Sequence, residues 1–431
     1  MEDSLPVTKG YGVAQVAIAL LVGLLLPSLA RGAGASPAKV LITGCPGNID
    51  LMYAWLKVDP LIDARLVPGS AQEGPWTEEQ VQRFLRLYFP RSYPQMLEYE
   101  YVILESIEAW VFNAQQERML YDGFYKGGLG GMQSRSVMSM HAYISVPWAN
   151  SIVSDAFPND ADAVVTMEYR LHHDPMKVVI NTNPNVPPVF TPYKDLPGVE
   201  FYYGGEYGTN LAIPKEGAVV ASYSVGPYKY GFPGALPDPR FESPGWIPHI
   251  MYWKYGNGTT WTHQDMAGMY WNTYWNPYAP DMIVAEIIFS TGRKLPEDVS
   301  MVHGLRTKFT GYASLRGFIF SIVDFVDRFG ANTAPVIQKM AGIGETIKEA
   351  EQLYRDQEYL ESFSTMDAAL TDLDLLRDQA LKLKDRALLW IYVTEWFAVS
   401  GVSLVVGFAL WTLMVRRRLY AEVGTTRLAG I

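Results

Sequence analysis

The sequence predicts an α/β fold with a doubly wound, mostly parallel sheet, followed by a helical hairpin stalk and a C-terminal transmembrane helix. Three observations lead to this prediction. Short apolar runs alternate with amphipathic stretches in the first half of the chain, helical spacing dominates from Phe318 onward, and the uncharged run 396–415 lies near the C-terminus. Strands that alternate with helices are typical of parallel sheets that are covered on both faces.

The first half of the chain contains the clearest strand and helix signals. Residues 39–43 form a continuous run rich in β-branched side chains, which predicts a buried strand. Thr77 and Gln80 have the spacing of a capping box and predict the start of a helix. The glycine-rich segment 127–131 then leads into a short strand or turn. The other predicted strands are 64–67 and 101–107, and the predicted helices are 49–57, 77–87 and 112–125.

After about residue 175 the pattern changes. Residues 181–197 are rich in proline and predict a long surface loop, and the apolar run 282–289 predicts a strand that closes the sheet. Tryptophans gather between residues 246 and 275. They are compatible with an aromatic surface or pocket, and equally with loops that pack over the sheet. Further strand-like runs are 199–203, 218–225 and 249–261.

The C-terminal third is predicted to be helical. Apolar residues recur at three- and four-residue spacing from Met366 to Ala387, which is typical of one face of a helix. An antiparallel partner helix is expected around residues 350–359, and the pair resembles one tetratricopeptide-like hairpin, which supplies a stalk rather than a repeat array. We expect one unbroken helix over residues 363–417.

Two apolar segments predict how the chain meets a membrane. Residues 396–415 reach ~30 Å as a helix, which is enough to cross the hydrocarbon core. Arg416, Arg417 and Arg418 follow at once and predict a cytoplasmic C-terminus. Near the N-terminus an apolar run precedes Ala33-Gly34-Ala35, so a cleaved signal peptide and a retained anchor are both open. The predicted domains are 1–35 as signal peptide or N-terminal anchor, 36–310 as an extracytoplasmic α/β domain, 311–387 as stalk, 388–415 as transmembrane helix and 416–431 as basic cytoplasmic tail.

Composition excludes several classes of protein. The net charge of -10 argues against a nucleic-acid partner, because binding to phosphates needs a basic face. The single cysteine excludes an internal disulfide. We therefore expect a single-pass protein of the cell membrane whose partners are the membrane itself and other envelope components.

Three features, in their order along the chain, carry a resemblance to a known family. The first strand ends at Gly44, the third is followed by a helix and by segment 127–131, and a late hairpin starts at residues 255–258 and ends at His263. In this order they resemble the class I glutamine-amidotransferase-like superfamily, especially its trehalose-utilisation-like and membrane-associated branches. The resemblance covers about residues 38–300. It implies a flavodoxin-like sheet, a catalytic histidine on the late hairpin and a nucleophilic cysteine in a G-x-C-x-G elbow.

The sequence departs from that family where the chemistry would occur. Residues 130–136 read Gly-Gly-Met-Gln-Ser-Arg-Ser, without the cysteine whose thiolate would attack an amide carbon. Cys45 instead follows the first strand, at the usual ligand crevice of α/β sheets, although simple packing also explains it. We expect no cofactor and no metal, since residues 172–174, His-His-Asp, lack a third spaced ligand.

Two classes of function remain. The first is a catalytically inactive head that binds a carbohydrate or peptide, or that contacts membrane-protein partners or a second copy. The second is an exported hydrolase of envelope carbohydrate or amide bonds, because the H-x-acid spacing at His263 suits a serine nucleophile. Ligand-binding residues in the first class would be Cys45, Asn48, Glu105, Gln133, Trp253 and Trp261, and the hydrolase would use His263 and Asp265 with Ser134 or Ser136.

Overall fold

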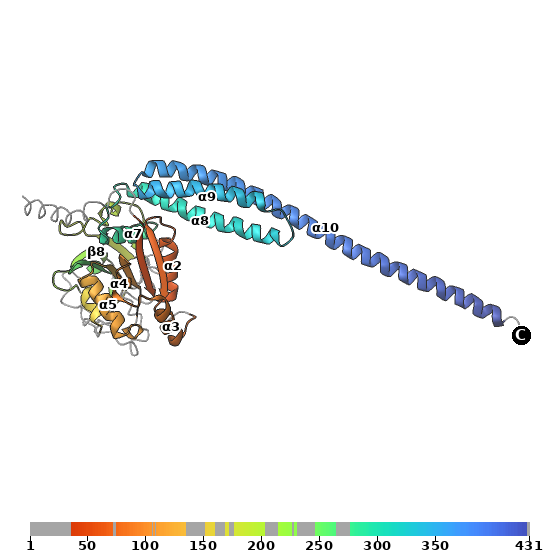
Figure 1. Ribbon diagram of the computed structural model, residues 1–431, viewed down its shortest axis with the longest axis horizontal. Helices are drawn as coiled ribbons and strands as arrows, with labels where there is room; N and C mark the ends of the chain where they lie inside the picture. The colour runs from red at the N-terminus through yellow and green to blue at the C-terminus, as the bar shows by residue number, and fades with distance from the viewer. Residues whose placement is uncertain are drawn as a thin grey trace, which may run out of the picture. The chain divides into compact units, whose positions relative to one another are not determined.

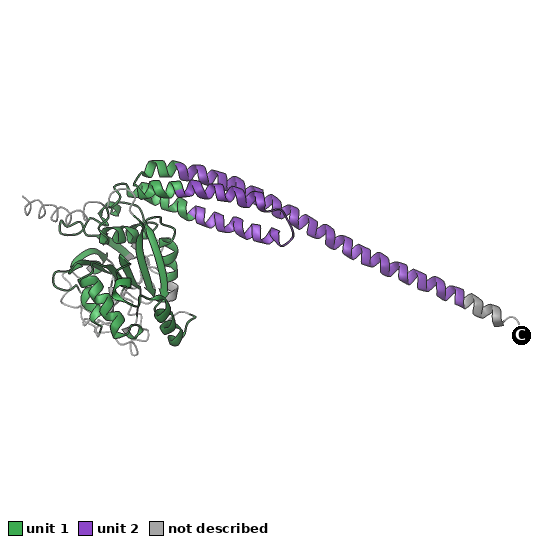
Figure 2. Ribbon diagram, viewed as in Figure 1, with its two compact units in different colours: residues 1–310, 349–364 green, residues 311–348, 365–431 purple. Residues whose placement is uncertain are grey.

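The computed structural model describes residues 36–71, 75–105, 107, 109–134, 151–159, 169–171, 176–202, 214–225, 228–230, 246–263 and 276–428. The chain divides into two compact units (Figure 2). Unit 1, which we call the head, comprises residues 1–310 and 349–364, and unit 2, the helical unit, comprises residues 311–348 and 365–431. The predicted signal peptide or anchor, residues 1–35, lies outside the described residues.

The head is built on one large mixed sheet (Figure 1). Its strands, within the described ranges, are β1 (Ala38–Gly44), β2 (Ile62–Pro68), β3 (Tyr101–Glu105), β4 (Gly130–Ser134), β6 (Met176–Ile180), β7 (Phe201–Tyr202), β8 (Val219–Val225), β10 (Trp246–Tyr255) and β11 (Gly258–His263). The spatial order is β2-β1-β3-β4-β11-β10-β8-β6-β7. A separate small sheet pairs β5 (Tyr169–Leu171) with β9 (Tyr228–Tyr230).

The direction of the strands changes halfway across the sheet. The strands from β2 to β11 run parallel, and every pairing from β11 to β7 is antiparallel. The α/β class is confirmed, but the prediction of a mostly parallel sheet is wrong for this second half. The reason is the tight turn at Gly256 and Asn257, which pairs β10 directly with β11 and lets β8, β6 and β7 continue antiparallel.

Helices cover both faces of the parallel half, as predicted. One face packs against α2 (Pro46–Leu56) and α7 (Ala279–Ser290). The other packs against α3 (Glu78–Tyr88) and α5 (Ala114–Tyr125), with the short α4 (Tyr93–Met96) and the 3-10 helices η2 (Ala109–Val111) and η4 (Ile152–Ala156) nearby. The capping box of α3 is confirmed, because Thr77 Oγ1 accepts from the Gln80 backbone and the Gln80 side chain accepts from the Thr77 backbone.

Two predictions about the second half of the head are wrong. The apolar run 282–289 belongs to helix α7 instead of a strand. Almost every residue of α7 is buried, so its sequence is apolar all round and lacks the periodicity that separates a helix from a strand. The proline-rich segment 181–197 is only partly a surface loop, since Phe190 and Tyr193, beside and within η5 (Thr191–Tyr193), are buried in the core.

Glycines at the start of β4 make room for aromatic rings on both faces of the sheet. A Cβ on Gly130 would lie 2.6 Å from the ring of Tyr101, and one on Gly131 would lie 2.4 Å from the ring of Phe124. The glycine-rich segment therefore serves close packing at the amino end of the strand. It does not form a loop at the carboxyl end, where a nucleophile elbow would be.

Three long helices follow the sheet, where a two-helix hairpin was predicted. They are α8 (Val299–Asp327), α9 (Ala334–Arg355) and α10 (Tyr359–Leu428), so the helical region begins before residue 311. The prediction of an unbroken helix over residues 363–417 is confirmed by α10. Two helices among the described residues are long and apolar enough to cross a membrane, α8 and the part of α10 up to Tyr420.

Candidate functional site

The last residues of four parallel strands of the head, β1, β3, β4 and β11, lie side by side in the sheet. Gly44 pairs with Glu105, Glu105 with Ser134, and Ser134 with His263. Neighbouring strands lie about 4.8 Å apart and registered residues share a face, so these side chains are direct neighbours. The residues two positions earlier in the strands lie in the core that α2 and α7 cover, and they are Ile42, Ile103, Met132 and Trp261.

Helix α7 supplies the acidic partner of His263. The Nε2 atom of His263 lies 2.7 Å from Glu286 Oε2, and the side chains are only 2% and 1% exposed. The hydroxyl of Tyr101 donates to Glu286 Oε1 at 2.5 Å. Burial and the neighbouring charge of Glu286 raise the pKa of Tyr101 well above its ordinary value, so the phenol stays protonated as a donor. We call Glu105, Ser134, His263 and Glu286 the carboxyl-edge cluster.

The cluster contains a hydroxyl, an imidazole and a carboxylate in the order that acyl-transfer enzymes use. Ser134 is beside His263 in the register, and Nε2 of His263 lies within hydrogen-bond distance of Glu286. Glu286 occupies the place that the sequence assigned to Asp265. Asp265 and Ser136 lie outside the described residues. Ser134 is itself buried, so a substrate reaches it only if the residues covering it move.

Gln133 does not belong to this cluster, because it faces the opposite side of the sheet. Its Nε2 donates to Asn159 Oδ1 at 2.5 Å and to Thr262 Oγ1 at 3.2 Å. Thr262 also donates to the same Asn159 oxygen. Since all three side chains are buried, this polar triangle joins β4, β11 and the segment after η4. Gln133, which was named with Glu105 as a ligand residue, therefore lies on the other face of the sheet from Glu105.

The tryptophans divide between core and surface. Trp261 is fully buried, packs against Phe190 and donates from Nε1 to Ser290 Oγ at 2.8 Å, so it cannot stack on a ligand at the surface. Trp253 is half-buried, with the Lys215 ammonium 5.4 Å from its ring centroid. The side chains of the other predicted platform tryptophans lie outside the described residues.

Cys45 follows β1, the strand from which the chain continues to β2 on one side and later to β3 on the other. Strand β1 has β2 on one side and β3 on the other, which is the switch point at which α/β folds commonly bind ligands. The Cys45 backbone donates to the Glu105 carbonyl at 2.9 Å, and a Cβ on Gly44 would lie 1.8 Å from that same oxygen. The thiol is buried next to this contact. The side chain of Asn48 lies outside the described residues.

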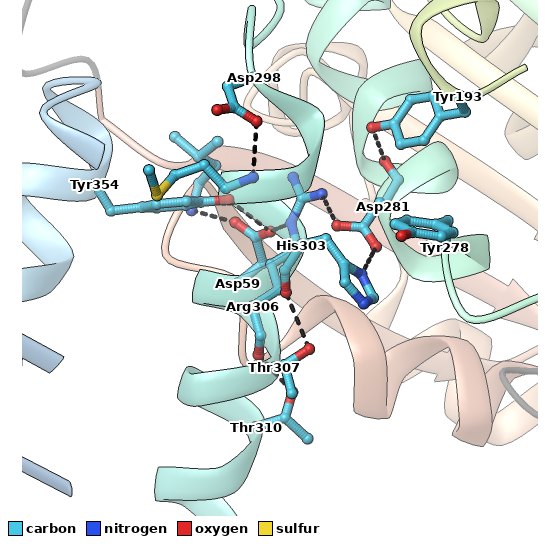
Figure 3. A network of polar contacts seen from close by, with 12 residues as sticks. Asp59, Tyr193, Tyr278, Asp281, Asp298, His303, Arg306, Thr307, Thr310 and Tyr354 are labelled. Atoms are coloured by element: carbon cyan, nitrogen blue, oxygen red, sulfur yellow. Dashed lines mark hydrogen bonds and ion pairs between the residues drawn. The ribbon is translucent and has the colours of Figure 1, made fainter. Parts of the chain in front are cut away.

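A second buried polar network was not predicted (Figure 3). Arg306 of α8 binds Asp59 through Nε and Asp281 through Nη1, the latter at 2.6 Å. His303 Nδ1 lies 2.7 Å from the other oxygen of Asp281, and the Tyr354 hydroxyl donates to Asp59. Burial acts to lower the pKa of Arg306, but its neighbours, Tyr354 and the two carboxylates among them, raise it well above the ordinary value. One guanidinium thus joins the loop after α2 to α7 and α8.

Sequence reasoning missed Glu286 and this network because their partners are distant in the chain. Glu286 is nevertheless the lone charge within an apolar run, a signal of a paired buried carboxylate that could have found it. Within the described ranges, no group of three His, Cys, Asp or Glu side chains could hold a metal ion. Residues 172–174, the other metal-ligand hypothesis, lie outside those ranges.

Comparison with other proteins finds no family and only distant similarity to solved structures. Neither a protein-family model nor a curated protein matches the chain. Among solved structures, the cytoplasmic protein STM1381 from Salmonella typhimurium LT2 is similar, with a TM-score of 0.39 and 13% sequence identity. That alignment covers 59% of this chain and 97% of the other.

Proposed function

We propose that this chain is a single-pass membrane protein of the cell envelope, with an extracytoplasmic head that binds a ligand or protein partner and carries out no amidotransferase chemistry. One observation carries the anchoring: most large apolar side chains of α10 from Leu389 to Met414 are more than half exposed. Such a continuous apolar surface is unfavourable in water and is covered by lipid. The segment 388–415 is ~42 Å long as a helix, close to the whole bilayer with its headgroups.

The charges at the end of this segment support its orientation. Arg416, Arg417 and Arg418 follow the apolar segment directly, and arginines are enriched on the cytoplasmic side of spanning helices. The head, which precedes the segment in the chain, would then lie on the outer side. Helix α8 is also long enough to span a membrane. However, 28% of its apolar stretch is buried within the protein, whereas none of the apolar stretch of α10 is buried.

The head is proposed to be flavodoxin-like and amidotransferase-like in its parallel half. The support is the order β2-β1-β3-β4-β11, with helices on both faces and a switch point at β1. Glu105, beside Cys45 at this switch point, is our candidate for contacting a carbohydrate or peptide ligand, because carboxylates accept from hydroxyl and amide groups. The amidotransferase nucleophile has no counterpart, since β4 ends in Ser134 and the only cysteine follows β1.

Membrane extraction tests the anchor. The full chain should stay in the membrane pellet at alkaline pH. Replacing Leu404 and Val405 together by arginine should release it, because each arginine at the centre of a span costs about 3 kcal/mol. The matched control is Leu360→Arg with Leu375→Arg, which also places two charges at exposed leucines of α10 but outside the span. Release of the unmodified chain by alkali would contradict the anchor.

A thermal-shift screen tests the binding role of the head. We expect an envelope oligosaccharide or peptide to raise the melting temperature of the full chain in detergent, and Glu105→Gln to remove this rise. Glu79→Gln, at an exposed glutamate of α3, is the control and should keep it. If Glu105→Gln and Glu79→Gln bind equally well, the switch point is not the binding site.

A serine hydrolase is the second candidate, favoured by the neighbouring Ser134, His263 and Glu286. Labelling of the full chain with a fluorophosphonate probe separates the two functions, since the probe reacts only with an activated serine. The binding function predicts no label. Labelling that is lost in Ser134→Ala and kept in Ser224→Ala, a change of another buried serine, would establish the hydrolase instead.

A further inference from the structure

The last turn of α8 and the connection to α9 carry an exposed aromatic pair. Phe325 and Phe329 are 36% and 51% exposed, and their ring centroids lie 5.0 Å apart in an edge-to-face arrangement. Arg328, between them in the sequence, extends into solvent, and its one ion pair among the described residues is with the exposed Asp324. Exposed pairs of this kind contribute little, so Arg328 is available to another anion. We call residues 325–333 the hairpin tip.

Contacts within the helical unit place this tip along α10. Helices α9 and α10 are antiparallel, with Lys339 Nζ donating to Gln379 Oε1 at 2.9 Å. Ile343 and Leu376 line one groove between the same helices. Since all α-helices rise equally per residue, the start of α9 at Ala334 comes level with about residue 384 of α10, and the turn before it lies at or just beyond this level. The turn is drawn beside α10 in Figure 1.

Burial along α10 agrees with this level. Ala387 is the last buried side chain in the described part of α10, and the residues after it are at most half-buried, so close packing ends near this residue. The proposed membrane segment begins at the next residue, 388. The exposed aromatics Trp390, Tyr392 and Trp396 follow, and such side chains are enriched at the membrane interface. The hairpin tip and the outer edge of the bilayer therefore lie at one level.

We propose that the hairpin tip rests on the outer surface of the same membrane that α10 crosses. Phe325 and Phe329 enter the headgroup region, and Arg328 faces the lipid phosphates. The inference rests on the proposed span of α10. It adds a second membrane contact, which holds the helical unit at a defined depth.

Fluorescence quenching in vesicles tests this contact. The full chain, with Cys45→Ala, is labelled with an environment-sensitive dye at Arg328→Cys and reconstituted into phosphatidylcholine and phosphatidylglycerol vesicles. One set of vesicles contains a lipid quencher in the headgroup region, for the label at Arg328→Cys, and a parallel set contains an acyl-chain quencher, for the label at the centre of the span. Label at Leu404→Cys reports the span, and label at Ser314→Cys, about 21 Å back along α8, reports the solvent side. We expect quenching by lipid at Leu404 and Arg328 and none at Ser314.

The aromatic pair is tested in the protein labelled at Arg328→Cys. Phe325→Ser with Phe329→Ser should abolish quenching there, while Phe318→Ser with Phe320→Ser, which removes two exposed phenylalanines farther from the tip, should leave it unchanged. Quenching at Leu404 without quenching at Arg328 overturns the tip contact and leaves the anchor intact. Absence of quenching at Leu404 refutes the anchor itself. A blue-shifted but unquenched label at Arg328 indicates contact with a second copy of the chain and likewise overturns the proposal.

Discussion

At the residue scale, the head depends on buried polar groups that satisfy one another. Glu286 accepts from Tyr101 and lies within hydrogen-bond distance of His263. Tyr101→Phe removes one donor and should lower the free energy of unfolding by about 1–2 kcal/mol, measured by denaturant titration of the full chain in detergent. Tyr99→Phe is the control: Tyr99 accepts a 3.3 Å bond from Arg65 at an exposed position, and its loss should cost less than about 0.5 kcal/mol. Equal effects of the two changes would show that the Glu286 contact is not stabilising.

The pH dependence of the head should contain a contribution from His249. Burial, with a smaller contribution from His263, lowers the pKa of His249 to about 3. An unfolded histidine titrates near 6.5, so below that pH the unfolded chain takes up a proton that the folded head refuses. The contribution of His249 to the free energy of unfolding is therefore fully present above pH 6.5 and is lost as the pH falls toward 3.

The measurement is the free energy of unfolding at pH 7.5 and pH 5. His249 should account for a loss of roughly 2 kcal/mol between these values, which His249→Gln should remove. The side chain also lies 3.2 Å from Ser222 Oγ, so the variant is compared by its pH slope and not by its absolute stability. An unchanged slope would mean that His249 is charged in the folded head.

At the element scale, strand β4 can approach its neighbours only because it starts with glycine. Gly130→Ala would drive a methyl group into the ring of Tyr101 and should cost about 2 kcal/mol or more in unfolding free energy. Gly317→Ala, inside α8 with open space around it, is the matched control and should stabilise its helix by about 0.5–1 kcal/mol. A tolerated Gly130→Ala would show that Tyr101 can move away, and with it the donor to Glu286.

Local signals along the chain were sufficient for some elements and not for others. The capping box at Thr77 was predicted and is confirmed, because its two hydrogen bonds join residues three apart. Helix α7 was predicted as a strand, because a helix buried on all sides has no polar face to reveal its period. The antiparallel half of the sheet was missed, since pairing between strands is decided by contacts that no single segment contains.

At the scale of the whole head, Arg306 connects elements that lie far apart in the chain. Arg306→Met leaves Asp59 and Asp281 buried without their cation and should cost about 3–5 kcal/mol of unfolding free energy. The control is Arg328→Met, which removes the arginine of an exposed ion pair at the end of α8 and should cost at most about 0.5 kcal/mol of unfolding free energy. Adding Asp59→Asn and Asp281→Asn to Arg306→Met should recover part of the loss. Without that recovery, the loss comes from packing of the arginine stem and not from charge.

The candidate site shows the same division between local and distant information. Glu105, Ser134 and His263 were all named from the sequence. Glu105 lies in the third predicted strand, Ser134 follows the glycine-rich segment, and His263 ends the late hairpin. Their alignment in one row followed from the strand order, which no local pattern contained. Gln133 and Glu105 were named together as ligand residues but lie on opposite faces of the sheet, and Trp261, also named as a ligand residue, fills the core.

By itself the sequence determined the α/β class, most helices and strands of the first half, the unbroken helix α10 and the lack of a cysteine after β4. These are consequences of composition and of periodicity over a few turns. Only the tertiary structure decided that Glu286 of α7 is the acid beside His263, that Arg306 joins two distant aspartates, and that the α8–α9 turn ends at the level where α10 becomes apolar. Each of these depends on which distant segments pack together, and packing is decided by the burial of the whole core.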